Sequence, residues 1–198
     1  MSSHSDESGK KLGMWLFLYT EIILFGALFV LYAVYFARYP GDFIEGGKEL
    51  NTLFGVVNTI ILLISSFSVA AAITAIQKKE KKMAVTGLVA GLLCGLVFLV
   101  NKYFEWSHKI DLGIFPNSEK LVDGPPGQNM FFGLYYVITG LHGIHIIIGM
   151  TLLFISLVFV QTGKTTHERF SLAENSGLYW HLVDLIWIFI FPLFYLVI

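Results

Sequence analysis

Five long apolar stretches constrain how this chain can fold more than any other feature of its sequence. A helix needs about 20 mostly apolar residues to cross about 30 Å of hydrocarbon, and each stretch is longer than that. Backbone N–H and C=O groups in lipid must find partners within the protein, so each stretch is predicted to be an α-helix. The five predicted membrane-spanning helices are residues 12–37, 50–76, 83–106, 130–160 and 174–198.

The composition is that of a membrane protein. Of the 198 residues, 56% are hydrophobic and only 14% are charged, whereas about a quarter of the residues of soluble domains are charged. The net charge of −1 and the lack of a basic arm give no indication of a nucleic-acid partner. The single cysteine, Cys94, has no second thiol for an intrachain disulfide or a cysteine metal site, so we interpret it as a small apolar residue.

The predicted helices are joined by short polar segments, most of which contain glycine or proline. None of these segments separates the helices into groups, so we expect one all-α domain, an integral membrane bundle over residues 12–198. A polar N-terminal tail, residues 1–11, precedes it and is expected to be unstructured. The apolar run after the tail is too long for the core of a signal peptide and lacks a small-residue cleavage site, so we expect it to be retained.

The distribution of lysine and arginine predicts the orientation, because these residues concentrate on the cytoplasmic side of membrane proteins. One side of the predicted bundle carries eight of them: Lys10, Lys11, Lys78, Lys79, Lys81, Lys82, Lys164 and Arg169. The other side carries five: Arg38, Lys48, Lys102, Lys109 and Lys120. We therefore predict that the N-terminus is cytoplasmic and that the C-terminus lies outside.

Glu21 lies inside the first predicted helix, about ten residues beyond Lys11 and therefore near the middle of the membrane. An ionisable side chain at that depth is costly unless it is paired or neutral, so we expect Glu21 to be protonated or hydrogen-bonded. Two interpretations remain. Glu21 is either an acid that exchanges protons or contacts lipid, or a structural acid that is bonded to a neighbouring helix.

The last two predicted helices contain three histidines and two carboxylates. His142 and His145 are three residues apart and share a helical face, and Glu174, His181 and Asp184 fall near one face of the last helix. Residues of these types on neighbouring helices are able to form a metal or haem site. The alternative is hydrogen bonding between helices that pack closely at nearby glycines.

Two further polar positions complete the set. Asn58 lies within the second predicted helix, followed by Thr59, and Glu105 precedes Trp106 at the end of the third. We expect Glu105 to be hydrated at the membrane interface, beside an aromatic anchor.

These polar positions fall in motifs that resemble subunit III of the haem–copper respiratory oxidases, the cytochrome c oxidase subunit III family. The stretch YWHLVDLIW at residues 179–187 resembles the family signature, and TGLHGIHIIIG at 139–149 resembles its paired-histidine helix. NTIILL at 58–63 is similar to the family's Asn-Thr helix. Glu21 matches the family's intramembrane glutamate, and Glu105 falls where the family has a Glu-aromatic pair. The resemblance covers nearly the whole chain, and the motifs occur in the family's order.

The helix count departs from many family members, which have seven helices, since this chain begins at what would be the third. Five-helix forms are familiar among bacterial quinol oxidases, some bacterial cytochrome c oxidases and accessory proteins of nitric oxide reductases. The resemblance therefore implies a bacterial cytoplasmic (inner) membrane. It favours a cytochrome c oxidase and leaves quinol open as the electron donor.

The resemblance also implies how the work is divided within the complex. The chain would have no redox cofactor, with haem and copper held by subunits I and II, which weighs against a metal site at His142, His145 and His181. It would pack on subunit I, bind phospholipid, and support proton uptake and oxygen access during aerobic electron transport. Glu21 would be the proton- or lipid-contacting acid. The helix-joining polar network would comprise Asn58, Glu105, His142, His145, Glu174, His181 and Asp184.

Three other functions remain open. An accessory subunit of nitric oxide reductase is not separated from an oxidase subunit by the helix count. A small membrane transporter would also carry intramembrane carboxylates, but no inverted repeat relates the two halves of the chain. A di-haem membrane cytochrome would use histidines on two helices, and a visible spectrum distinguishes it.

Overall fold

The computed structural model describes residues 2–163 and 167–197, and in these residues every regular element is a helix. The helices are α1 (Ser2–Arg38), α2 (Pro40–Lys48), α3 (Thr52–Gln77), α4 (Lys81–Asp111), α5 (Glu119–Val122), α6 (Pro126–Gln161) and α7 (His167–Tyr195). By length and composition α1, α3, α4, α6 and α7 are able to cross a membrane. The predicted all-α bundle of five membrane-spanning helices is confirmed.

Several helix boundaries differ from the predicted ones. The expectation of an unstructured tail is wrong for most of its length, since α1 begins at Ser2. Once a helix has formed, each further residue adds one backbone hydrogen bond, so a polar flank can continue it. The segment after Arg38, expected to be a short polar connection, forms α2, with Pro40 at the first helical position, where proline is favoured.

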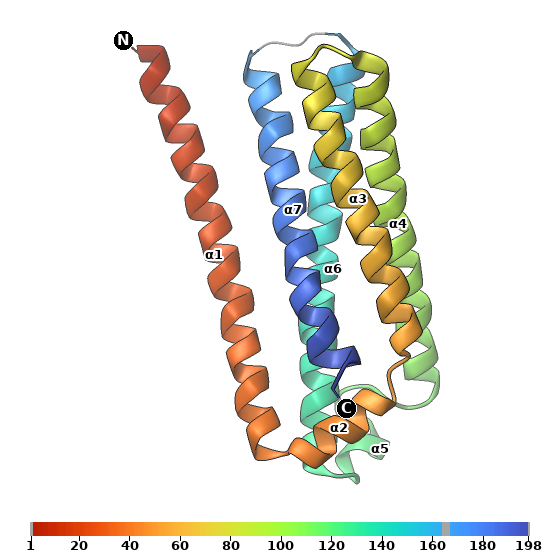
Figure 1. Cartoon of the computed structure of the whole chain (residues 1–198). Coiled ribbons are helices and arrows are strands. Elements are labelled where there is room, and N and C mark those ends of the chain that lie inside the picture. The colour runs from red at the N-terminus through yellow and green to blue at the C-terminus, as the bar shows by residue number, and fades with distance from the viewer. Residues whose placement is uncertain (1, 164–166, 198) are drawn as a thin grey trace.

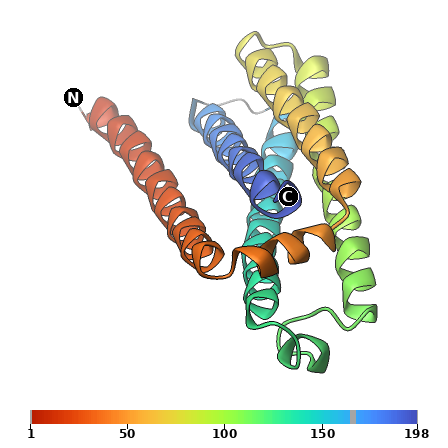
Figure 2. The same ribbon diagram turned by 60° about the horizontal axis from the view of Figure 1, so that its bottom comes forward.

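Helices α3, α4, α6 and α7 form a compact four-helix bundle, and α1 stands to one side of it (Figure 1). The turn end of the bundle carries the α3–α4 turn, the end of α6 and the start of α7. The opposite end, which we call the α2 end, carries α2, α5 and the C-terminal residues. Figure 2 shows α2 leading from α1 to α3 across the ends of α6 and α7.

Polar side chains fix the ends of several helices. The Asn51 carboxamide oxygen accepts a hydrogen bond from Leu53 N at 3.0 Å and so caps α3. Asp42 of α2 accepts from Gly127 N at 3.0 Å and caps the start of α6 from another helix. At the turn end, Lys81 Nζ donates to the Gln161 carbonyl at 2.7 Å, which satisfies a carbonyl at the end of α6.

The centre of the bundle is built around the indole of Trp180, which is fully buried. A Cβ atom added at Gly95 or Gly149 would lie 2.8 or 2.7 Å from that indole, so α4 and α6 approach it only because both residues lack side chains. Its Nε1 donates to Ser65 Oγ at 3.0 Å. One side chain of α7 thus packs against three helices at once.

Candidate functional site

Glu21 of α1 points at His145 of α6. Glu21 Oε2 lies 2.7 Å from His145 Nε2, and the two side chains are 13% and 9% exposed. Phe25, one turn further along α1, packs edge-on to the imidazole at a centroid distance of 5.3 Å. Glu21 therefore makes a direct link between α1 and the bundle.

The second nitrogen of His145 determines where protons reside in this pair. His145 Nδ1 lies 2.7 Å from the Leu141 carbonyl oxygen. A carbonyl only accepts hydrogen bonds, so Nδ1 carries a hydrogen. The contact between Nε2 and Oε2 then requires one more proton, which belongs either to the Glu21 carboxyl or to an imidazolium. In both cases the pair has no net charge, which is the condition for holding such groups in a membrane.

The pair lies at the edge of the molecule. Next to Glu21 on α1, Ile22 is 52% exposed, and Tyr19 is 62% exposed. Toward the α2 end, the Tyr32 hydroxyl fastens α1 to α7 by donating to the Leu193 carbonyl. The shared proton is therefore close to the surface that α1 presents to lipid or to another subunit.

A second group of polar side chains is buried nearer the α2 end, and we call it the lysine cluster: Lys102, Glu105, Tyr135 and Tyr195. Lys102 Nζ lies 3.0 Å from Glu105 Oε2, and it donates to the hydroxyls of Tyr135 at 2.9 Å and Tyr195 at 3.0 Å. The Tyr195 hydroxyl in turn donates to Glu105 Oε1 at 2.7 Å. All three N–H groups of a lysine ammonium are thereby satisfied.

The lysine cluster corrects two expectations. Glu105 is not hydrated at a helix end: its side chain is 4% exposed, and that of Lys102 is 8% exposed. Lys102 lies within the predicted span 83–106 and is among the five positive charges assigned to the outer side, but its side chain is buried in the bundle. The spacing of three residues between Lys102 and Glu105 places them on one helical face and was the signal that sequence reasoning missed.

Lys109 lies beyond the predicted span 83–106, but it too belongs to α4 and is buried, at 5% exposure. It donates to the Glu49 backbone carbonyl and lies 4.0 Å from the Glu49 carboxylate. Of the charges assigned to the predicted cytoplasmic side, Lys164 lies outside the described residues, as do the side chains of Lys10, Lys11 and Arg169.

Other predicted polar residues link helices in separate pairs. Asn58 of α3 accepts a hydrogen bond from Asn101 of α4 at 2.9 Å. His181 of α7 lies with Nδ1 2.6 Å from Ser66 Oγ of α3. Thr59, which follows Asn58, accepts from the Trp187 indole at 3.0 Å.

Three of the predicted residues make no such link within the described residues. His142 is fully buried between Phe98 and Trp187, and neither ring nitrogen has a hydrogen-bond partner there. Both carboxyl oxygens of Asp184 are buried without a partner in the same part of the chain. Glu174 is half-buried. Across residues 2–163 and 167–197, no three His, Cys, Asp or Glu side chains are placed to hold a metal ion.

Comparison with known proteins finds similarity over nearly the whole chain. The family model described as cytochrome c oxidase subunit III matches residues 2–197. The chain is 32% identical over 197 residues to cytochrome c oxidase subunit 3 of Synechocystis sp., covering 98% of this chain and 78% of that protein. It is 29% identical over 193 residues to the cytochrome bo(3) ubiquinol oxidase subunit 3 of Buchnera aphidicola subsp. Baizongia pistaciae, covering 96% and 92%.

A longer relative is similar as well. The chain is 30% identical over 193 residues to the heme-copper oxidase subunit I+III of Aeropyrum pernix. This match covers 93% of the chain but only 22% of that protein, so the chain spans less than a quarter of its length.

Proposed function

Because the chain belongs to the cytochrome c oxidase subunit III family, we propose that it is subunit III of a bacterial haem–copper terminal oxidase. Its relatives are named as subunits of both cytochrome c and quinol oxidases, at 32% and 29% identity. We propose the cytochrome c type, with quinol as the alternative donor. The partners would be subunits I and II, which would carry the haem and copper.

A supporting role without a redox centre agrees with how the intramembrane histidines are used. His145 is bonded through both nitrogens, to Glu21 and to the Leu141 carbonyl. His181 is bonded to Ser66. His142 is enclosed by the rings of Phe98 and Trp187. In the described residues it belongs to no group of three His, Cys, Asp or Glu side chains that could hold a metal ion.

The observation that carries the proposal is the 2.7 Å contact between Glu21 and His145, whose other nitrogen is committed to a carbonyl. This pair holds one transferable proton while it stays neutral overall. Placed where α1 meets lipid or a neighbouring subunit, it would take up and release a proton beside subunit I. It would thereby support proton uptake during turnover.

Glu21→Gln tests this role. A glutamine amide N–H can still donate to His145 Nε2, so the link between α1 and α6 is kept while the transferable proton is removed. We expect normal amounts of subunit III in the purified complex, with slower proton uptake and oxygen consumption. Glu174→Gln is the matched control, because it removes a half-buried acid outside the pair.

Two outcomes would contradict the proposed role. Unchanged proton uptake and oxygen consumption in Glu21→Gln would show that the transferable proton has no function. Loss of the subunit from the complex in this variant would show that the acid is structural.

For location, we propose the bacterial inner membrane, with the turn end cytoplasmic. The α3–α4 turn supports this orientation, because Lys78, Lys79, Lys81 and Lys82 lie at or beside it. At the opposite end, Lys102 and Lys109 are buried against Glu105 and Glu49, so they present little positive charge to water. Labelling of cysteines introduced one at a time at Lys79 and Lys120, in a Cys94→Ser background and in intact cells, distinguishes the two orientations.

A further inference from the structure

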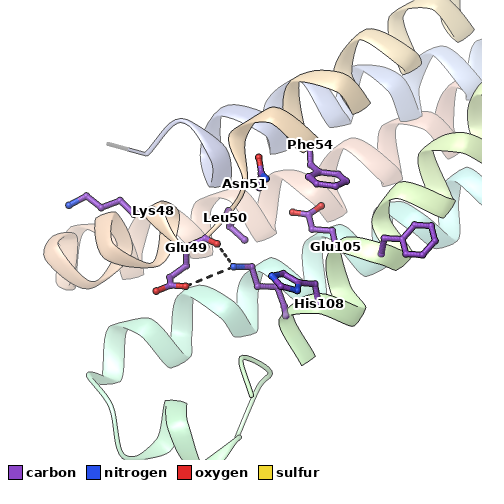
Figure 3. Close-up of a pocket in the computed structure, with 9 residues that line it drawn as sticks. Lys48, Glu49, Leu50, Asn51, Phe54, Glu105 and His108 are labelled. Atoms are coloured by element: carbon purple, nitrogen blue, oxygen red, sulfur yellow. Dashed lines mark hydrogen bonds and ion pairs between the residues drawn. The ribbon is translucent and has the colours of Figure 1, made fainter. Parts of the chain in front are cut away.

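A pocket of about 390 Å³ opens at the α2 end of the molecule, between the α2–α3 connection and the last turns of α4 (Figure 3). Residues 48–51 and Phe54 line one side, and residues 104, 105, 108 and 109 of α4 line the other. Its size is within the range of about 300–1,000 Å³ that is usual for small-molecule sites. The Glu21–His145 pair does not line this pocket, and Glu105 is the one residue of the lysine cluster that does.

One part of the pocket offers hydrogen-bond donors. Lys109 Nζ donates to the Glu49 carbonyl and approaches the Glu49 carboxylate at 4.0 Å, as the dashed lines in Figure 3 show. An ammonium has three N–H groups, so Lys109 keeps donor capacity for a further partner. His108 is exposed on the same helix. Asn51 uses its carboxamide oxygen to cap α3, which leaves its NH₂ group for the pocket.

Another part offers acceptors. Glu105 points toward Asn51 and Phe54 in Figure 3, and it is the one member of the lysine cluster that lines the pocket. Each of its oxygens accepts one hydrogen bond, from Lys102 and from Tyr195. A carboxylate has about four acceptor sites, so two remain. The Glu49 carboxylate, at 55% exposure, adds further acceptor sites.

The charges around the pocket balance. Each lysine has a carboxylate partner: Lys102 lies 3.0 Å from Glu105, and Lys109 lies 4.0 Å from Glu49. Lys48 points away from the others in Figure 3 and is paired with Glu45 at 2.8 Å. A neutral site with separate donors and acceptors fits a zwitterion better than a single anion or cation.

The pocket also adjoins the lipid-facing surface. Phe54 is 38% exposed and Phe104 is 60% exposed, and both belong to membrane-spanning helices. Their neighbours Leu53 and Tyr103 are 68% and 69% exposed. Polar and apolar walls therefore meet where the spans end, at the level of the lipid head groups.

We propose that this pocket binds the head group of a zwitterionic phospholipid that carries a primary ammonium. The phosphate lies against Lys109, His108 and Asn51, and the ammonium donates to Glu105 and Glu49. The acyl chains run over Phe54 and Phe104. A choline head group has no N–H to donate to the carboxylates, and an anionic glycerol head group adds a charge that the site does not balance. This assignment does not depend on the proposed function.

The test is native mass spectrometry of the full chain, purified in mild detergent with the subunits that accompany it, after exchange into ethanolamine, choline or glycerol phospholipid. We expect one retained ethanolamine phospholipid per chain, with choline and glycerol lipids retained at least about tenfold less. Glu49→Gln and Lys109→Gln each remove a charge-assisted contact, so occupancy falls about tenfold. Lys82→Gln is the matched control, because this exposed lysine lies at the turn end, away from the pocket, and the variant retains the lipid as the wild type does.

Lys109 also holds the α2–α3 connection, so its variant alone would not separate binding from folding. Glu49→Gln separates them, because this exposed side chain can be changed while Lys109 keeps its bond to the Glu49 backbone carbonyl. Equal retention of the three lipid classes by the wild type would overturn the proposal. Wild-type occupancy in Glu49→Gln, or loss of lipid in Lys82→Gln, would overturn it as well.

Discussion

Glu21 on α1 and His145 on α6 share one proton across a 2.7 Å contact, because the other nitrogen of His145 is committed to the Leu141 carbonyl. The contact joins residues 124 positions apart in the sequence, and it attaches the outlying helix to the bundle. The same contact thus has a structural part, the helix link, and a chemical part, the transferable proton. Variants can separate the two.

His145→Leu leaves Glu21 without its partner. We expect the free energy of unfolding to fall by about 1–3 kcal/mol, since a half-buried acid then lacks its hydrogen bond. The double variant Glu21→Leu, His145→Leu removes both polar groups and is expected to recover most of that loss. Thermal denaturation in detergent, analysed as a double-mutant cycle, measures the coupling. Simple additivity of the two single variants would contradict a direct link.

We expect the lysine cluster to contribute more to the free energy of unfolding than the exposed ion pair between Lys48 and Glu45 does. Lys102→Met leaves the buried Glu105 carboxylate uncompensated, which we expect to lower the free energy of unfolding by about 3–5 kcal/mol. Lys48→Met breaks a pair whose side chains are 58% and 60% exposed, and the expected loss is below about 1 kcal/mol. Denaturation of the two variants under the same conditions gives the comparison. Equal losses would mean that the cluster is hydrated in solution.

The packing around Trp180 predicts a contrast between two glycines of α6. Gly149→Ala places a Cβ atom 2.7 Å from the Trp180 ring, and such overpacking costs about 1–3 kcal/mol. A Cβ at Gly143 has no atom within 4 Å, so Gly143→Ala is expected to be neutral or to stabilise the helix by up to about 1 kcal/mol. Melting temperatures of the two variants test this contrast. If Gly149→Ala melted at the same temperature as the wild type, the Trp180 indole could not pack against Gly149 as it does in the structure.

The membrane-spanning helices could be predicted from the sequence because their signal is local. Apolar length alone marks a span, and the span from Leu12 to Arg38 was placed to within one residue. Helix α2 was missed because two glycines, Gly46 and Gly47, weaken its helical pattern. In the structure both are buried where other helices come close, with Phe131 and the Val197 carbonyl as their neighbours.

The polar contacts were predictable only in part. Groups on one helix, such as Lys102 and Glu105, are related by spacing that the sequence contains. Contacts between helices, such as Glu21 with His145 or His181 with Ser66, depend on which helices are neighbours and on how each helix is rotated about its own axis. No local pattern holds that information. For the same reason the sequence did not indicate that His142 and Asp184 would be buried without the links made by their neighbours.

Purification through a tag on this chain in mild detergent, followed by a visible spectrum and subunit masses, tests the central proposal most directly. The account predicts co-purification of a large catalytic subunit, with the visible absorption of a-, b- or o-type haem. It also predicts a subunit II that carries a copper centre or is of the quinol-oxidase type, which identifies the electron donor. A colourless chain that purifies alone, a nitric oxide reductase as its partner, or haem bound to the isolated chain would contradict it.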